Sequence, residues 1–461
     1  MSERGLQAAR KKMIDAGVSV PAIEVFSTFY RQLESGETGL IREDTIDPLL
    51  DPPMLADMEI GEEAATDAIG KTVVIKLNGG LGTSMGLDKA KSLLEVRDGL
   101  TFLDLLARQV LSARERYGAR LPLVLMNSFR TDADTVEFLA KYPELVVAGL
   151  PLSFVQNQEP KLRADDLTPV EWESDPALEW CPPGHGDLYP ALEGSGALDA
   201  LLAQGFRYAC VSNGDNLGAA PNATIAGWFA QSGAPYAAEV CRRTINDRKG
   251  GHLAIRKADG QLILRDTAQT AEEEMHYFTD EHRHPFFHTN NLWFDLRQLR
   301  DTLTERASVL GLPLIRNEKT VDPTDSSSTP VIQIESAMGA AIEVFEGATA
   351  ICVGRDRFLP VKTTNELLLL RSDAYDLDEA GHLVLRAAAS PEVSLNKAYK
   401  TVQEFERRIP SAPSLRQATA LRVKGDWTFG VGVKVIGAAE LTREGGSGRV
   451  PDGAVLGDAG R

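Results

Sequence analysis

The sequence predicts an α/β protein built on a mixed, mostly parallel, Rossmann-like sheet, and three observations support this prediction. Residues 72–77 form a run rich in β-branched side chains that ends in glycines, as a buried strand leading into a turn does. Thr101 then opens an amphipathic helix, and residues 121–126 have the composition of the next strand. A strand, a helix and a strand in this order form the βαβ unit of a parallel sheet.

The sequence of the first part of the chain predicts helices, which a tether joins to the rest of the protein. Phe26 and Leu33 lie on one face at helical spacing, and Gly36 follows the end of that helix. A stretch rich in proline and aspartate follows at 47–53. We therefore interpret residues 1–70 as an N-terminal helical segment.

The middle of the chain continues the α/β pattern. Further strands are predicted at 208–212, 237–241 and 292–294. Together with the first βαβ unit, they define an α/β domain over residues 71–375.

The last part of the chain has a different composition. We expect a helix over 397–408, followed by residues 423–437, in which apolar residues alternate with glycines. This alternating pattern is typical of one coil of a β-solenoid or of a small β-sheet. We interpret 376–461 as a C-terminal helix plus a short β-solenoid-like domain. The residues expected to bury one apolar side against the preceding helix are Trp427, Phe429, Val431, Val433 and Val435.

Composition and charge narrow the classes of function. The 49 Lys and Arg residues against 66 Asp and Glu residues give a net charge of -17, which argues against nucleic-acid or anionic-membrane partners. No apolar run approaches the length of a membrane span, and the N-terminus lacks the apolar core of a signal peptide, so we expect a cytoplasmic protein. The cysteines form no C-x-x-C pair and are expected to be reduced thiols: Cys181, Cys210, Cys241 and Cys352.

The most informative segment is a glycine-rich loop after the first predicted strand, at residues 76–86. Its glycines allow backbone N–H groups to approach a phosphate closely, and Lys91 follows nine residues after Gly82. The loop is not a Walker motif, because Leu87 stands where that motif needs glycine followed by lysine. Met85 likewise breaks the dinucleotide fingerprint, which excludes an NAD-dependent dehydrogenase. The loop and its lysine favour a cradle for a triphosphate.

With its companion motifs, this loop resembles the eukaryotic-type UTP–glucose-1-phosphate uridylyltransferases, also called UDP-glucose pyrophosphorylases. Their hallmark, L-x-G-G-L-G-T-x-M-G followed by a lysine, runs here from Leu77 to Gly86 and Lys91. The resemblance implies a sheet of the nucleotidyltransferase type, attack of a sugar phosphate on the α-phosphorus of UTP, and a Mg²⁺ cofactor. Further matching segments follow in the family's order at 123–129, 182–187, 211–218, 289–293, 333–339, 357–364, 425–430 and 451–456.

The resemblance implies roles for residues on the nucleotide side. Lys91 and Lys362 match the family's phosphate-binding lysines and are the expected catalytic residues, while Asp215 is the expected ligand of Mg²⁺. His185 either contacts the ligand or only orients its loop. The other expected UTP contacts are Leu77, Gly79, Gly80, Gly82, Thr83, Gln156 and Gly184.

The sugar side is implied in the same way, and here the chain departs from the family pattern. Sugar contacts are expected at Gly251, Asp266 and Asn290, with Asn213 supporting both substrates. Asp266 stands where the family usually has glutamate, and His288 where it usually has asparagine. Gly214 replaces a customary aliphatic residue beside Asp215.

Two other functions compete with this interpretation. The UDP-N-acetylhexosamine pyrophosphorylases carry Arg-Leu-Gly where this loop has residues 84–86, and a non-catalytic nucleotide-binding protein would not need Lys91, Asp215 and Lys362. The expected partners are UTP and a sugar 1-phosphate, with glucose 1-phosphate favoured. The polar, glycine-rich residues 457–461 offer no apolar strand edge, so we expect a monomer or a small homo-oligomer.

Overall fold

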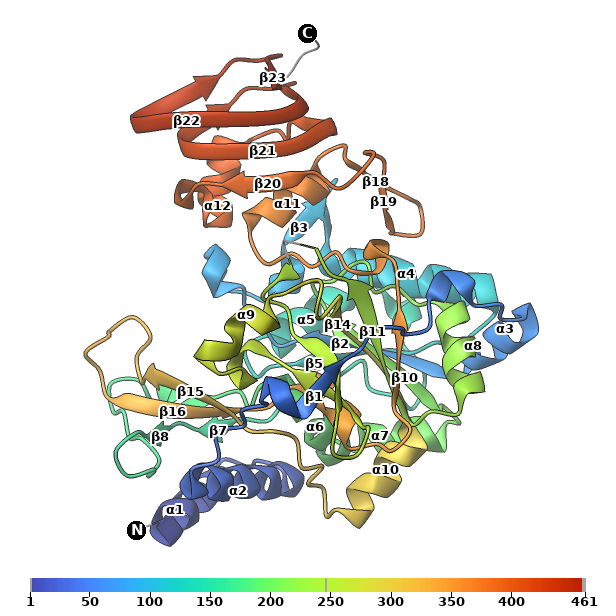
Figure 1. The fold of residues 1–461 in the computed structure, drawn as a ribbon, viewed down its shortest axis with the longest axis vertical. Coiled ribbons are helices and arrows are strands. Elements are labelled where there is room, and N and C mark those ends of the chain that lie inside the picture. Colours follow the sequence, from blue (N-terminus) through green and yellow to red (C-terminus); the bar gives the residue numbers. More distant parts are fainter. Residues whose placement is uncertain (1, 245–246, 458–461) are drawn as a thin grey trace.

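The computed structural model describes residues 2–244 and 247–457. A seven-stranded sheet forms its centre, and four of the six neighbouring strand pairs are parallel. The predicted mixed, mostly parallel sheet is confirmed. The strands, in sheet order, are β17 (Thr349–Cys352), β11 (Tyr236–Arg242), β14 (Phe286–Asp295), β10 (Tyr208–Asn213), β2 (Thr72–Asn78), β5 (Leu123–Asn127) and β6 (Ser153–Val155), with β14 antiparallel to both neighbours (Figure 1).

Helices cover both faces of this sheet because successive side chains of the central strands point to opposite sides. Val73 and Ile75 pack into one hydrophobic core and Val74 into the other, and all three are buried. The first core is shared with α2 (Val20–Ser35), α6 (Leu188–Gly194), α7 (Ala197–Ala203) and α10 (Leu296–Glu305). The second is shared with α3 (Glu62–Gly70), α4 (Phe102–Tyr117) and α8 (Ala223–Ser232).

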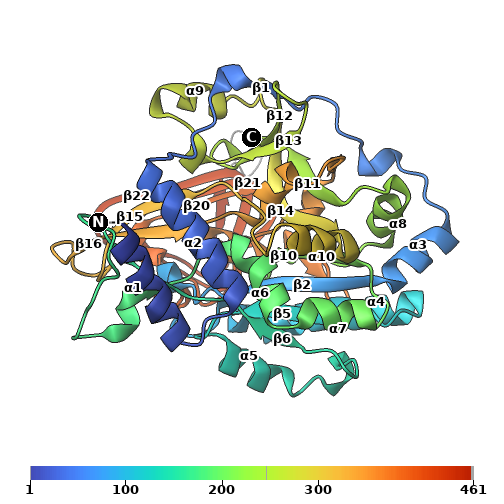
Figure 2. The same cartoon turned by 90° about the horizontal axis from the view of Figure 1, so that it is seen from below.

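The N-terminal segment is only partly helical, which corrects the prediction for residues 1–70. The first two helices form as expected, with Ser19 capping the start of α2 and Gly36 ending it at φ +78°. They lie side by side (Figure 2). The tether then contributes β1 (Ile46–Pro48), which pairs antiparallel with β12 (His252–Arg256). The first helix is α1 (Ser2–Asp15).

Smaller elements surround the central sheet. One antiparallel sheet has the order β1–β12–β13, with β13 at Leu262–Arg265. Another has the order β15 (Ile315–Thr320), β16 (Pro330–Glu335) and β8 (Leu162–Arg163). The remaining short elements are β3 (Glu95–Arg97), β4 (Leu100–Thr101), β7 (Glu159–Pro160), β9 (Trp180–Cys181), β18 (Tyr375–Leu377), β19 (Leu383–Leu385), α5 (Asp132–Leu139) and α9 (Met275–Phe278).

A parallel sheet closes the chain at the opposite end of the molecule from the N-terminus (Figure 1). Its four strands are β20 (Glu392–Leu395), β21 (Ser414–Phe429), β22 (Lys434–Val450) and β23 (Val455–Gly457), and all three pairings are parallel. Helix α11 (Thr364–Arg371) packs against both β3 of the body and β20, and α12 (Val402–Arg408) lies in the chain between β20 and β21.

Two predictions for this region need correction. Residues 397–408 are not one helix: a 3₁₀ turn comes first, and Thr401 then caps α12 through its side chain. Val431 is 62% exposed, because it lies in the turn between β21 and β22, whereas Phe429, Val433 and Val435 are buried as expected. The expectation for the chain end falls mostly on residues 458–461, outside the described residues.

Among the residues that the structure describes, no helix is long and apolar enough to cross a membrane. The four cysteines are free thiols, as expected, and three of them are buried.

Candidate active site

The glycine loop lies where the central strands of the sheet end. Strand β2 is parallel to β10 and to β5, so the residues that follow these strands meet at one edge of the sheet. Gly79 and Gly80 follow β2, and Asp215 follows β10. Together they border a cleft of about 340 Å³, which we call the first cleft. Its lining residues are Leu77, Asn78, Gly79, Gly80, Lys91, Ser92, Met126, Gln156, Pro182, Gly184, His185, Asn213, Gly214 and Asp215.

The loop folds back so that its lysine reaches the glycines. The backbone N–H of Lys91 donates to the Gly80 carbonyl at 3.0 Å. Gly82 adopts φ +70°, and a Cβ at that position would lie 3.2 Å from Cγ of Lys91. A larger residue at Gly82 would therefore push the lysine stem out of place.

The lysine and the aspartate predicted to act on phosphate are in direct contact. Nζ of Lys91 lies 2.5 Å from Oδ2 of Asp215, and it also donates to the carbonyl of Val361. Both charged side chains remain partly exposed to the cleft, at 16% and 22%. Because Lys362 follows Val361 directly, this contact also brings the second predicted lysine to the same region.

The unusual glycine beside this aspartate is explained by its surroundings. The Gly214 N–H donates to the Leu77 carbonyl at 2.8 Å, and a Cβ on Gly214 would lie 2.9 Å from the same oxygen. The carbonyl belongs to the backbone and cannot swing aside, so an aliphatic residue at this position would force the two strand ends apart.

The first cleft also carries two further predicted UTP contacts, Gln156 and Gly184. Gln156 packs against Gly79, where a Cβ would lie 3.0 Å from its Oε1. Gly184 adopts φ +77°, and a Cβ there would lie 2.7 Å from the carbonyl oxygen of Ser336. Only glycine fits this position without moving the neighbouring backbone.

His185 orients its loop and also lines the cleft, so both expected roles are compatible with the structure. Its Nδ1 accepts a hydrogen bond from the backbone N–H of Met338 at 2.9 Å. Burial lowers the pKa of His185, so the imidazole is neutral and its proton sits on Nε2.

A second cleft, of about 320 Å³, holds the predicted sugar contacts. Gly251, Asp266 and Asn290 all border it, and Lys362 does as well. Asn213 lines both clefts, which places it between the two expected substrates. The other residues that line the second cleft are Asn216, Asp247, Lys249, Gly250, Phe287, His288, Thr289, Phe358 and Pro360.

Two of the departures from the family pattern lie in this second cleft. Asp266 caps a 3₁₀ turn by accepting from the N–H of Thr267 at 3.1 Å. His288 is buried, and its Nδ1 accepts from the N–H of Asn290 at 3.2 Å. Burial, together with the nearby His185, lowers the pKa of His288 to about 3, so this side chain is neutral.

A buried ion pair anchors the segment that leads to Lys362. Glu239 accepts from Nη2 and Nε of Arg357, at 2.7 and 2.9 Å. Side-chain amides of Asn216 and Asn291 donate to the Arg357 carbonyl at 3.2 and 3.3 Å. The arginine in the predicted 357–364 motif is thus structural.

The structure does not bring every predicted residue into a cleft. Gly82 and Thr83 line neither cleft: Gly82 contacts the stem of Lys91, and Thr83 is exposed. Sequence reasoning in turn missed Asn78 and Lys249, which line the first and second clefts. Their positions carried a signal, because each directly precedes two glycines.

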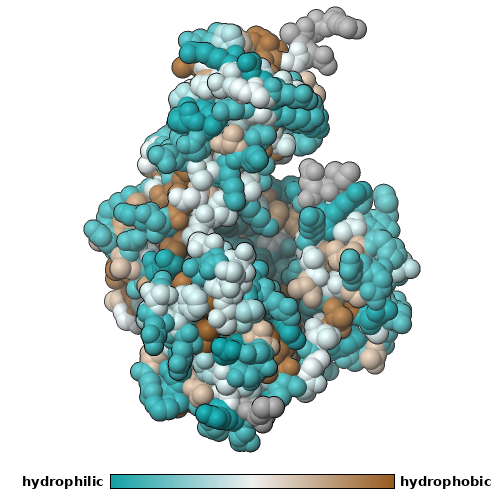
Figure 3. Space-filling view, turned by 90° about the vertical axis from the view of Figure 1, so that its left-hand side faces the viewer, coloured by the Kyte–Doolittle hydropathy of each residue, from teal (hydrophilic) through white to brown (hydrophobic). Residues whose placement is uncertain are grey.

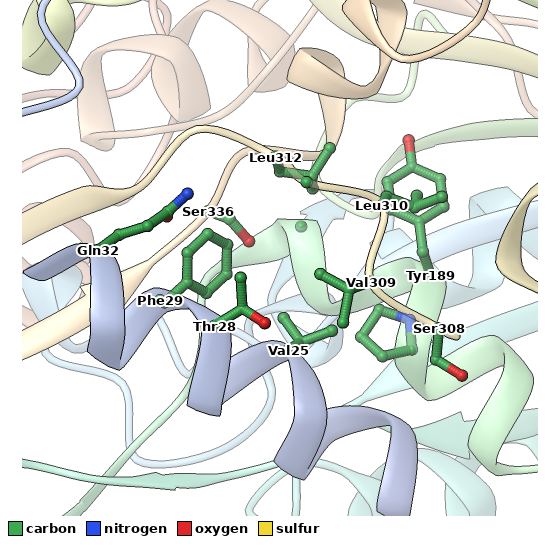
Figure 4. Close-up of a pocket in the computed structure, with 13 residues that line it drawn as sticks. Val25, Thr28, Phe29, Gln32, Tyr189, Ser308, Val309, Leu310, Leu312 and Ser336 are labelled. Carbon is green, nitrogen blue, oxygen red and sulfur yellow. The ribbon is translucent and has the colours of Figure 1, made fainter. Parts of the chain in front are cut away.

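A narrow apolar pocket lies apart from both clefts. Side chains from α2, among them Val25 and Phe29, face residues 308–312 across it (Figure 4). No Asp, Glu, Lys, Arg or His lines the pocket among the described residues, so it does not suit a polyphosphate. The surface is instead hollowed below the C-terminal sheet, on a mostly hydrophilic face (Figure 3).

Two polar clefts that share Asn213 at the carboxyl edge of a mostly parallel sheet define a nucleotide-binding α/β enzyme. A family model described as "UTP--glucose-1-phosphate uridylyltransferase" matches residues 23–435. The chain belongs to this family.

Individual relatives agree with the family match. The UTP–glucose-1-phosphate uridylyltransferase of Solanum tuberosum is 39% identical over 395 residues, covering 84% of this chain and 80% of that protein. The enzyme of the same name from Saccharomyces cerevisiae is 41% identical over 393 residues, covering 84% and 77%. A crystal structure of a UDP-glucose pyrophosphorylase variant from Leishmania major in complex with UDP-glucose superposes with a TM-score of 0.92 at 44% identity, covering 99% and 98%. These matches favour the uridylyltransferase interpretation over both alternatives.

Proposed function

We propose that this protein transfers the uridylyl group of UTP to glucose 1-phosphate, giving UDP-glucose and pyrophosphate. The observation that carries the proposal is the contact between Lys91 and Asp215 in the first cleft, which shares Asn213 with the second. Relatives that are 39% and 41% identical are named for this reaction.

The reaction needs positioning and charge neutralisation rather than a protein nucleophile. A phosphate oxygen of the sugar phosphate attacks the α-phosphorus of UTP, and the bond to the β-phosphate breaks, so that pyrophosphate leaves with that electron pair. Lys91 from the first cleft and Lys362 from the second stabilise the charge that develops between the two polyanions. Asn213, which borders both clefts, orients the substrates toward each other.

We also propose that the enzyme uses Mg²⁺. No group of three or more His, Cys, Asp and Glu residues could hold a metal within the described ranges. A single carboxylate nevertheless fits Mg²⁺, which takes most of its ligands from phosphate oxygens and water. Asp215 would hold the ion, which would neutralise phosphate charge.

A pyrophosphate-release assay tests the reaction itself. UTP with glucose 1-phosphate should release pyrophosphate faster than UTP with N-acetylglucosamine 1-phosphate or other sugar 1-phosphates. UTP should also be preferred over ATP, because Gln156 and the Gly184 backbone bound a pocket suited to a pyrimidine. No pyrophosphate release with any sugar phosphate would refute the proposed function.

The metal requirement has its own test. Excess EDTA should stop turnover, and Mg²⁺ should restore it. Asp215→Asn should raise the Mg²⁺ concentration needed for half-maximal rate, because the substitution removes a charged oxygen ligand. Full activity of the wild-type enzyme in metal-free buffer would contradict this proposal.

We propose three finer properties as well. The free cysteines suit a cytoplasmic location. The all-parallel C-terminal sheet, in which each strand is added beside the preceding one, suits a β-solenoid-like domain. A monomer or small homo-oligomer is proposed for solution, and light scattering on the purified protein measures it.

A further inference from the structure

A buried cluster of charges lies behind the second cleft, among residues that have no role so far. Arg265 is fully buried, and it donates to Glu43 and, at 2.7 Å, to Oε2 of Glu274. Glu43 also accepts from Arg283 and from Nε2 of His284, the latter at 3.1 Å. The backbone N–H of Glu43 donates to Oε2 of Glu274 at 2.9 Å, and Arg265 joins the two carboxylates.

Glu43 is charged in this cluster although it is buried. Burial by itself raises the pKa of Glu43, but hydrogen bonds from Arg283, His284 and Arg265 outweigh it and hold the pKa below its usual value. The negative charge therefore compensates the Arg265 guanidinium, which has no contact with solvent. A buried arginine that lost one of its two carboxylate partners would be held less firmly.

The cluster is directly connected to the sugar side of the site. Arg265 ends β13 and precedes Asp266, and a Cβ on Gly251 would lie 3.2 Å from the Asp266 carboxylate carbon. Oε1 of Gln269 accepts from the Asp266 N–H at 2.9 Å. The backbone carbonyl of Gln269 accepts from the N–H of Ile41 at 2.8 Å. The N-terminal tether, which we take as residues 37–61 between α2 and α3, thus holds the loop that carries Asp266.

The strand pairing brings the same tether to the other sugar segment. Strand β1 follows Glu43 by three residues and pairs with β12, which begins one residue after Gly251. Figure 2 shows β1 beside β12 and β13, on the same side of the molecule as α9. None of these contacts involves the first cleft, whose walls come from β2, β10 and the loop near Gly184.

We propose that Glu43 is a positioning residue for the sugar phosphate. It fixes Arg265, and through it the adjacent Asp266 and Gly251, in the arrangement that borders the second cleft. This inference rests on the proposed function, because it assigns the second cleft to the sugar phosphate. It assigns no role in UTP binding to Glu43, because the first cleft is built from other segments.

The test is a steady-state comparison of Glu43→Gln with Glu273→Gln in the full-length enzyme. The first substitution keeps the shape of the side chain and removes its charge. The control removes a carboxylate from an exposed ion pair with Arg42 in the same region. We expect Glu43→Gln to raise KM for glucose 1-phosphate by on the order of tenfold, because small displacements of positioning groups are costly. KM for UTP should stay within about twofold of the wild-type value. In the control Glu273→Gln, KM for UTP and KM for glucose 1-phosphate should both stay within about twofold of the wild type.

A second variant tests the inference if Glu43→Gln does not fold. Glu274→Gln removes the other carboxylate that accepts from Arg265, and it should raise the same KM if Glu43→Gln proves unstable by circular dichroism. Equal rises in KM for UTP and for glucose 1-phosphate would overturn the inference, as would an unchanged KM for the sugar in a folded variant. If neither variant folds, the cluster serves folding and the inference fails. Wild-type enzyme that releases no pyrophosphate would instead refute the proposed function.

Discussion

The two clefts of this site are built in different ways. The first cleft is formed mainly by residues that directly follow strands of the central sheet, such as Gly79 after β2 and Asp215 after β10. The second cleft is bordered by residues beside β12 and β13, whose sheet includes β1 from the N-terminal part of the chain, and by residues 287–290 within the central strand β14. The first cleft therefore rests on the central sheet, whereas the second combines one central strand with the smaller β1–β12–β13 sheet.

The departures from the family pattern fall on both kinds of segment. Of the two that border the second cleft, Asp266 follows β13 of the small sheet, whereas His288 lies within β14 of the central sheet. The departure near the first cleft, Gly214, is held by a backbone contact with Leu77 that leaves no room for a side chain. Variants that affect one cleft and spare the other test this division.

The largest effect is expected from Lys91, which lines the first cleft. Lys91→Met should lower kcat by on the order of 100-fold or more, because it removes a positioned cation and opens no core volume. Steady-state rates with UTP and glucose 1-phosphate measure this effect. Lys89→Met, at an exposed position in the same loop, is the matched control and should behave like the wild type. A Lys91→Met enzyme with near-normal kcat would remove Lys91 from the catalytic machinery.

Two glycine-to-alanine variants, at Gly184 and Gly196, test the first cleft separately from the second. Gly184→Ala should raise KM for UTP by about tenfold or more and leave KM for glucose 1-phosphate nearly unchanged, because the new Cβ would lie 2.7 Å from the Ser336 carbonyl oxygen and displace the loop. Gly196→Ala is the control: its φ of +76° matches, but no atom lies within 4 Å of the new Cβ. Gly196→Ala carries the backbone cost of about 1–2 kcal/mol for a left-handed residue. Gly184→Ala adds further backbone strain, because φ +77° with ψ 178° is a region essentially restricted to glycine. If the two variants show the same KM for UTP, steric contact at Gly184 has no role.

The smallest effect is expected on the sugar side, from His288→Asn. Asparagine can accept the Asn290 N–H in place of the imidazole, so KM for glucose 1-phosphate should change by only a few fold. The clearer readout is stability at low pH. Because the folded pKa of His288, about 3, lies below the ordinary value of 6.5, its contribution is complete above about pH 6.5 and is lost as pH falls toward 3.

Urea denaturation at pH 7.5 and at pH 5 measures this contribution. Between pH 7.5 and pH 5 the wild type should lose more unfolding free energy than His288→Asn does. Only in the wild type does unfolding release an imidazole that takes up a proton at pH 5, and this proton uptake favours the unfolded chain. Identical losses in the two proteins would show that the imidazole is not held neutral by the fold.

Local signals in the sequence predicted much of the fold correctly. Thr101 and Asp104 form the expected capping box at the start of α4, and Gly118 ends that helix. The β-branched run before the glycine loop is β2. The failures have local causes too: residues 397–408 carry a helical composition, but Thr401 begins a new helix rather than continuing one.

The sequence by itself determined the start of the glycine loop and the aspartate after β10, because each closely follows a strand of the parallel sheet, and it placed Lys91 in the same segment. Only the tertiary structure decided which residues stand behind the second cleft. Glu43 lies 222 positions before Arg265 in the chain, and no local pattern reveals a pairing over that distance. Such contacts form because a buried guanidinium requires carboxylate partners, and the fold alone selects which carboxylates come within reach.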